Sequence, residues 1–215
     1  MSELFLGQAP SFQLLRAFEM AYDRHPFQVI AFCFMSNHYH VLLRSHEGNL
    51  SQIMKIVNRR YSDSYHDRYG FIGRIYQGRF WANEVPTVRG LLEVSAYIHR
   101  NPIETEVPMV DVLEQYPYSS FPYYASPELV LPRFLDVSYL PNLLPYPFPP
   151  TAPGYVDFVL HRSFFAIEDG RKQDQDRTQP LVPFKGLLLR ERGKLGMRVQ
   201  RPKQGQSAED CPPRE

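Results

Sequence analysis

The chain has only two cysteines among its 215 residues, Cys33 and Cys211. One falls in an apolar run and the other in a polar tail, so they form no disulfide framework and favour a reducing, cytoplasmic location. The N-terminus lacks the basic start and the sustained apolar stretch of a signal peptide. No apolar run approaches the length that spans a membrane. These absences argue against a secreted disulfide-rich protein and against a membrane protein.

The formal net charge of the whole chain is also small, at only +1, and the sequence has no internal repeats. The distribution of charge says more than the total. Between Arg44 and Arg100 the sequence holds nine basic and five acidic residues, so this segment is locally basic. A hydrophobic fraction of 43% and an aromatic fraction of 14% indicate a globular protein with a substantial core.

The order of the expected elements predicts an α+β fold. Ser11 is placed to cap a first helix, and a strand pair follows between Phe27 and Arg44. A long helix is expected over Asn49–Tyr69, then a strand over Tyr76–Val85, then a helix from Thr87 to about Asn101. Helix, strand, strand, helix, strand, helix is the order of an antiparallel sheet covered by helices.

Composition changes after about residue 125, which predicts three parts. Residues 1–125 are expected to form the main domain and residues 126–167 a proline-rich extension. Residues 168–215 are charged and rich in Gln, Gly and Pro, with only a three-leucine patch at 187–189 to bury. We expect this tail to be largely disordered.

Two histidines lie two residues apart in the second expected strand. Successive side chains of a strand point to opposite faces, so His38 and His40 share one face while Tyr39 lies on the other. Two adjacent imidazoles on a rigid strand form half of a metal site. A pair of core or edge histidines is the alternative, because the spacing alone is a weak motif.

The last expected helix carries a tyrosine on an unusual face. Its apolar stripe includes Leu91, Leu92 and Ile98, and at about 100° per residue Tyr97 falls roughly opposite the centre of that stripe. Asn101 follows one turn later, directly before a proline that disfavours helical geometry. On this pattern alone, Tyr97 could equally be a half-buried packing residue.

Four ordered blocks together resemble one protein family. The run from Ala31 to Leu43, with Ser36-Asn37-His38-Tyr39-His40, resembles the His-hydrophobic-His (HUH) signature of single-tyrosine transposases, which include the REP-associated tyrosine transposases. Ile75–Phe80 resembles the family's strand after its long helix, and Tyr97–Pro102 resembles the segment with its nucleophilic tyrosine. Pro117–Phe121 resembles a further block, where the family usually has Trp at the second position.

The resemblance implies a ferredoxin-like or RRM-like fold and a DNA transposase. Such enzymes cut and rejoin single-stranded or hairpin DNA through a 5′-phosphotyrosine intermediate, here on Tyr97, and would act at the nucleoid. It further implies a divalent metal, Mg²⁺ or Mn²⁺, held by His38, His40 and Asn101. Two imidazoles suit Mn²⁺ at least as well as Mg²⁺.

Several polar residues are candidates to hold DNA phosphates, although a solvated basic face explains them about as well. Tyr76 or Trp81 could stack on bases. The candidates are Lys55, Arg59, Arg60, Arg74, Gln77 and Arg79.

One departure from the family concerns its first strand. The family begins with a strand ahead of the first helix, and nothing in Ser2–Pro10 resembles it. Either the true start lies upstream or the chain is a decaying copy. A sheet without that strand would expose unpaired backbone edges. We therefore expect a poorly active enzyme, with weak solubility or a homodimer that repairs the sheet.

A non-catalytic DNA-binding remnant is the alternative function, and an unrelated metal-dependent hydrolase is a third that the tyrosine block disfavours.

Overall fold

The structure is a computed structural model that describes residues 10–45, 48–76, 80–161 and 186–192. Its helices and strands are, in chain order, α2 (Pro10–Tyr22), β1 (Gln28–Phe34), β2 (His38–Arg44), α3 (Leu50–Tyr69), β3 (Trp81–Val85), α4 (Val88–Arg100), α5 (Phe121–Ala125), α6 (Ala152–Leu160) and β4 (Gly186–Arg192). Two short 3₁₀ helices, η1 (Leu113–Gln115) and η2 (Pro141–Leu143), lie in the connections.

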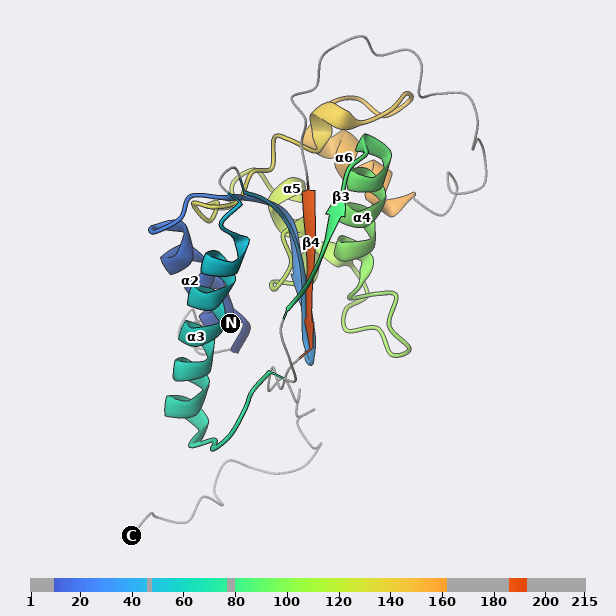
Figure 1. Cartoon of the computed structure of the whole chain (residues 1–215). Coiled ribbons are helices and arrows are strands. Elements are labelled where there is room, and N and C mark those ends of the chain that lie inside the picture. The colour runs from blue at the N-terminus through green and yellow to red at the C-terminus, as the bar shows by residue number, and fades with distance from the viewer. Residues whose placement is uncertain (1–9, 46–47, 77–79, 162–185, 193–215) are drawn as a thin grey trace, which may run out of the picture.

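The four strands form one antiparallel sheet in the order β1-β2-β4-β3. Figure 1 shows this sheet nearly edge-on, with α2 and α3 on one side and α4, α5 and α6 on the other. Each side has its own hydrophobic cluster, one built with α2 and α3 and one built with α4 and α6. The predicted α+β fold, an antiparallel sheet covered by helices, is confirmed.

The predicted hairpin forms β1 and β2. The backbone N–H of Met35 donates to the carbonyl of His38 at 2.8 Å and closes the turn. Phe32 and Phe34 belong to the cluster on the α2–α3 side, whereas Cys33 belongs to the cluster on the α4 side. Because both faces of β1 are covered, its sequence reads as a nearly unbroken apolar run.

Helix ends follow local signals that the sequence carries. Gly70 ends α3 in the left-handed conformation, with φ 57°, and its N–H donates to the carbonyl of His66. Thr87 caps α4, its hydroxyl accepting the N–H of Gly90 at 3.0 Å. The strand expected over Tyr76–Val85 is shorter, because β3 begins only at Trp81.

The outer edge of β1 is paired with loop segments that lie far along the chain. The Phe34 N–H donates to the carbonyl of Tyr118 at 2.9 Å, and the Val29 N–H donates to the carbonyl of Phe134 at 2.8 Å. Residues of η2 and α6, including Leu143 and Tyr155, join the hydrophobic cluster that α4 forms on the sheet. The proline-rich region up to residue 161 thus packs on the predicted main domain, and the division at residue 125 stays a prediction. In the described part of the chain, no helix is long and apolar enough to cross a membrane.

The predicted disordered tail contains a strand, which corrects the expectation for residues 186–192. β4 pairs with β2 from His38↔Arg192 to Leu43↔Leu187 and with β3 from Trp81↔Arg190 to Val85↔Gly186. The leucine patch at 187–189 lies opposite Leu43, Leu42 and Val41, all buried. Contiguous leucines suit a central strand, because such a strand is covered on both faces.

β4 also occupies the place that a strand ahead of α2 would take in such a sheet. A strand ahead of α2 would run parallel to β1 and lie one strand away from it, as in a split β-α-β unit. β4 lies between β2 and β3 and is antiparallel to both, so it runs parallel to β1. The expected gap in the sheet is therefore filled, within one chain, by a segment from the opposite end of the sequence.

Candidate active site

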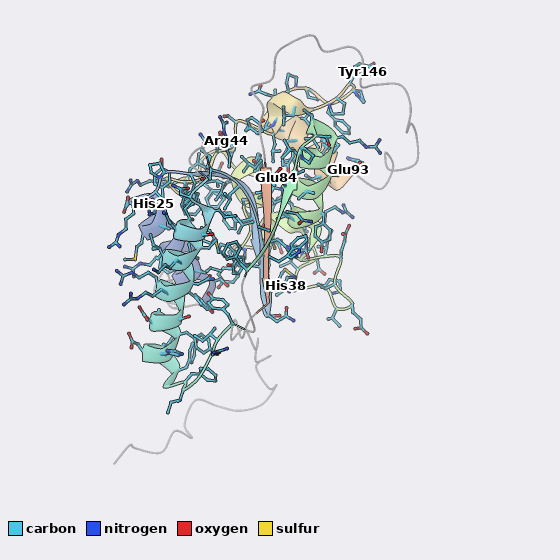
Figure 2. The ribbon with its side chains drawn as sticks, in the orientation of Figure 1. His25, His38, Arg44, Glu84, Glu93 and Tyr146 are labelled. Carbon is cyan, nitrogen blue, oxygen red and sulfur yellow. The ribbon has the colours of Figure 1, made fainter. Side chains whose placement is uncertain are left out.

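The two histidines of β2 lie side by side on the face of the sheet that α4 covers. Their ring centroids are 4.9 Å apart and their planes are nearly perpendicular, at 84°. His40 is buried, with 1% of its surface exposed, and His38 is half-buried. Figure 2 shows His38 at the end of the sheet remote from Arg44. The predicted common face of the two imidazoles is confirmed.

The orientation of His38 is set by the residue before it. Nδ1 of His38 lies 2.6 Å from the side-chain oxygen of Asn37. An amide oxygen only accepts hydrogen bonds, so Nδ1 carries the proton and the acceptor lone pair of the ring is on Nε2. Metal-binding histidines are commonly oriented by such a bond. The role of Asn37 was not predicted from the sequence, where its position next to His38 was the available signal.

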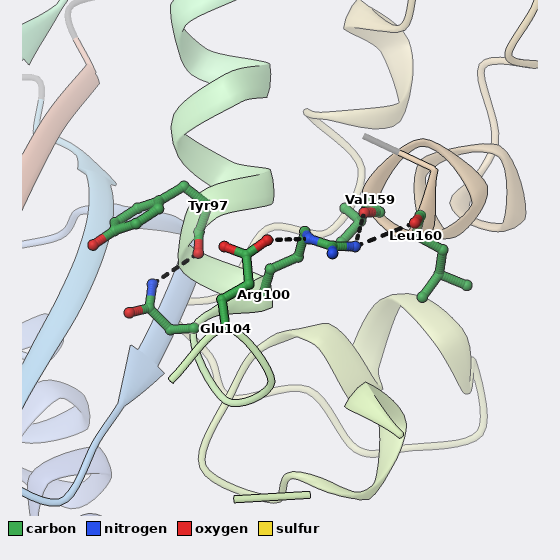
Figure 3. Close-up of polar contacts among 6 residues, drawn as sticks. Tyr97, Arg100, Glu104, Val159 and Leu160 are labelled. Atoms are coloured by element: carbon green, nitrogen blue, oxygen red, sulfur yellow. Dashed lines mark hydrogen bonds and ion pairs between the residues drawn. The ribbon is translucent and has the colours of Figure 1, made fainter. Parts of the chain in front are cut away.

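Tyr97 lies against His40. The two ring centroids are 5.4 Å apart with an interplanar angle of 72°, and Tyr97 is 37% exposed. Figure 3 shows the tyrosine ring projecting from α4 toward the strands. Leu91, Leu92 and Ile98 of the same helix are buried. The tertiary structure thus brings the three most informative residues of the sequence together.

Asn101 lies one turn after Tyr97 and is held by it. Its side-chain Nδ2 donates to the carbonyl oxygen of Tyr97 at 2.7 Å, drawn as a dashed line in Figure 3. The backbone keeps helical angles, φ −46° and ψ −42°, even though Pro102 follows. Because Nδ2 donates its hydrogen bond to the helix, Oδ1 is the atom of the Asn101 side chain that could bind a cation.

The donor set fits half of a site for a divalent ion. His38 and His40 supply two neighbouring imidazoles. Within the residues that the structure describes, no group of three or more His, Cys, Asp or Glu side chains is arranged to hold a metal. The remaining positions around an ion would therefore fall to an amide oxygen, to water or to substrate oxygens, which are the ligands that Mg²⁺ and Mn²⁺ prefer.

His99 and Arg100 fasten the tyrosine helix to the rest of the protein. His99 is fully buried, with Nε2 at 2.7 Å from the Ser120 hydroxyl and Nδ1 at 3.0 Å from the Tyr155 hydroxyl. Arg100 pairs with Glu104 at 2.6 Å and donates to the last carbonyls of α6, at Val159 and Leu160 (Figure 3). Burial in this network gives His99 a structural role.

Burial of His99 predicts acid sensitivity of the fold. Burial lowers the pKa of His99 from 6.5 to about 3. Between these values the unfolded chain binds a proton at this position and the folded protein does not. Stability is therefore fully retained above pH 6.5 and falls as the pH drops toward 3, by at most about 1.4 kcal/mol per pH unit.

The measurement is the free energy of urea unfolding of the wild type and of His99→Gln at several pH values from 7 to 4. The variant should be less stable at pH 7, but its stability should depend less steeply on pH than that of the wild type. Equal slopes for both proteins below pH 6.5 would contradict this assignment.

The basic residues predicted to bind DNA lie away from the histidine pair. Lys55, Arg59 and Arg60 are exposed on α3, on the other side of the sheet from α4. There they line a surface groove together with Arg24 and His25. Arg74 is exposed in the loop after α3. Gln77 and Arg79 lie outside the residues that the structure describes.

Comparison with protein families identifies the matching part of the chain. The model of the IS200-like transposase family matches residues 4–101, a range that contains His38, His40 and Tyr97 and ends at Asn101. The match covers just under half of the chain. The match begins ahead of α2 and ends one residue after α4.

Similarity to a curated transposase agrees with this match. A REP-associated tyrosine transposase of Haemophilus influenzae is 26% identical over 117 residues. That alignment covers 49% of this chain and 65% of the relative, so the chain spans just under two thirds of that transposase. No solved structure matches the chain significantly. The block at 117–121 lies beyond the IS200-like family match, and its Ser119 and Ser120 hydroxyls contact the Phe32 carbonyl of β1.

Proposed function

We propose that this protein is a transposase that cuts and rejoins single-stranded or hairpin DNA through a covalent bond between Tyr97 and a 5′-phosphate. The observation that carries the proposal is the ring of Tyr97 against His40, which is itself against His38. The match of residues 4–101 to the transposase family model supports the DNA substrate. A tyrosine that is partly exposed, on a buried helix beside two imidazoles, suits a nucleophile better than a packing residue.

The reaction exchanges one phosphodiester for another. The Tyr97 oxygen attacks the phosphorus, a tyrosine–phosphate bond forms, and the bond from phosphorus to the 3′ oxygen breaks. The phenol loses its proton and the leaving 3′ oxygen gains one. Because the number of phosphoester bonds is unchanged, attack by a 3′ hydroxyl on the tyrosine ester reverses the step and rejoins DNA without an energy source.

His38 and His40 would hold the divalent ion, and Oδ1 of Asn101 is the third candidate ligand. When bound, such an ion stabilises the negative charge that develops on the phosphate and orients the scissile bond. Asn37 would keep His38 in the tautomer with its lone pair on Nε2. Burial of His40 and the network behind His99 would keep the tyrosine helix at a fixed distance from the metal ligands.

The basic groove on α3 would bind DNA that flanks the cleavage position. Lys55, Arg59 and Arg60 are separated from the histidine pair by the sheet. They would contact phosphates of flanking DNA, and Arg74 would extend that contact. A DNA-binding remnant without cleavage is the second candidate function. It predicts DNA binding without any covalent product.

The test is a covalent adduct. The purified protein is incubated with end-labelled single strands that carry hairpins, in the presence of Mn²⁺ or Mg²⁺, and analysed on a denaturing gel. We expect a labelled band that migrates with the protein, at least as strong with Mn²⁺ as with Mg²⁺, and lost on chelation by EDTA. Binding without any adduct over a range of substrates would favour the remnant. An adduct that persists in EDTA would contradict the metal role.

A further inference from the structure

The strand β4 carries two arginines at register positions beside the histidines. Arg192 lies directly opposite His38, and Arg190 lies directly opposite His40 on one side and Trp81 on the other. Residues directly opposite in antiparallel strands lie on the same face of the sheet. Positions 190 and 192 therefore share the face of the two histidines. Glu191, opposite Tyr39, lies on the other face.

The change from leucine to arginine falls where β4 passes from the core to the site. Residues 187–189 lie opposite Leu43, Leu42 and Val41, which are buried among apolar side chains. The cations begin at the position opposite His40, the first polar residue of this part of β2. Two cationic residues at neighbouring register positions of one strand repel each other unless an anion is bound near them.

An anion on this face would change that balance. Arginine binds phosphate oxygens through two parallel N–H groups, and it stays charged at any pH of interest. A phosphodiester attacked by Tyr97 would lie on the same face, because the Tyr97 ring packs against His40. Trp81, 51% exposed, belongs to the same row across three strands and offers a surface on which a base could stack.

We infer that Arg190 and Arg192 bind the phosphates of the single strand that is cut at Tyr97. The C-terminal strand would thus supply part of the DNA site as well as closing the sheet. This inference rests on the proposed function, and it adds residues that lie about ninety positions beyond the tyrosine and outside the family match.

Binding can be measured apart from cleavage in a Tyr97→Phe background. The variants are Arg190→Gln and Arg192→Gln, with Glu191→Gln as the matched control on the same strand and the opposite face. We expect each arginine variant to bind a single-stranded oligonucleotide about tenfold more weakly at low salt. The slope of log affinity against log salt should fall by about 0.7 for each phosphate that the variant no longer neutralises. Glu191→Gln should keep the salt slope of its parent.

The pairing of β4 is tested independently by a cross-link between neighbouring strands. Glu84 and Leu187 are directly paired in β3 and β4, and paired Cα atoms lie about 4.5–5.5 Å apart, within the range of a disulfide. Glu84→Cys with Leu187→Cys, in a Cys211→Ser background, should form a disulfide within one chain. A cross-linked dimer would mean that the strand comes from a second copy, and no cross-link would overturn the inference.

The outcomes separate this inference from the proposed function. If the wild type forms the adduct while both arginine variants bind like their parent, the arginine inference is wrong and the transposase proposal stands. If the arginine variants lose affinity and salt dependence but the wild type never forms an adduct, the arginines bind DNA and the cleavage proposal fails. An equal weakening of binding in the arginine variants and in Glu191→Gln would indicate a general disturbance of β4 and overturn the inference.

Discussion

Replacing Tyr97 with phenylalanine is expected to abolish the covalent protein–DNA adduct and to lower strand cleavage by on the order of 10⁴-fold or more. The substitution removes one hydroxyl and keeps the ring that packs 5.4 Å from His40. Fold and DNA binding should therefore be preserved. The loss would reflect the missing nucleophile, because phenylalanine has no oxygen with which to attack phosphorus.

The matched control is Tyr146→Phe. Tyr146 is 92% exposed, and Figure 2 shows it at the opposite end of the molecule from His38. This variant should form the adduct at the wild-type level. Adduct formation by Tyr97→Phe would mean that another tyrosine is the nucleophile, and peptide mapping of the adduct would identify it.

Replacing either histidine is expected to remove metal-dependent cleavage while leaving single-stranded DNA binding mostly intact. His38→Gln and His40→Gln remove an imidazole ligand each, and glutamine fills much of the volume that the buried His40 occupies. Loss of a metal that stabilises developing charge costs several kcal/mol, so we expect cleavage to fall by about 10³-fold or more. The measurement is adduct formation across a Mn²⁺ titration.

A substitution beside the metal ligands should have a smaller effect on the same site. Asn37→Ala removes the partner of His38 Nδ1 and should raise the Mn²⁺ concentration for half-maximal cleavage by about 10–100-fold. Maximal cleavage should recover at high Mn²⁺. His161→Gln is the control, since His161 is exposed directly after α6 and has no part in the proposed site. Wild-type cleavage by His38→Gln and His40→Gln would show that these two histidines are structural.

Local patterns in the sequence were sufficient to predict the strand and the helix that carry the site residues. The two-residue spacing places His38 and His40 on one face of a strand, and the structure has them there. The cap at Thr87 and the left-handed Gly70 mark helix ends as expected. These features could be predicted because they depend on backbone geometry within a few residues. The blocks at His38–His40 and Tyr97 also indicated the transposase family whose model matches residues 4–101.

The contact between Tyr97 and His40 depends on packing that periodicity does not contain. The helical pattern placed Tyr97 away from the apolar stripe, but the direction of the site depends on how α4 lies on the sheet. The basic face of α3 shows the same limit. Lys55, Arg59 and Arg60 lie in the same locally basic segment of the sequence as Tyr97. In the folded protein, the sheet separates these three residues from the site.

By itself, the sequence determined the α+β class, the hairpin with its two histidines, the helix with its tyrosine, and the resemblance to the transposase family. Only the tertiary structure decided that residues 186–192 complete the sheet between β2 and β3. Strand pairing between segments about 150 residues apart leaves no local period. In the sequence, residues 186–192 are a short leucine run within a charged tail, a pattern that predicts disorder. In the folded protein, two partner strands satisfy the backbone hydrogen bonds of this segment.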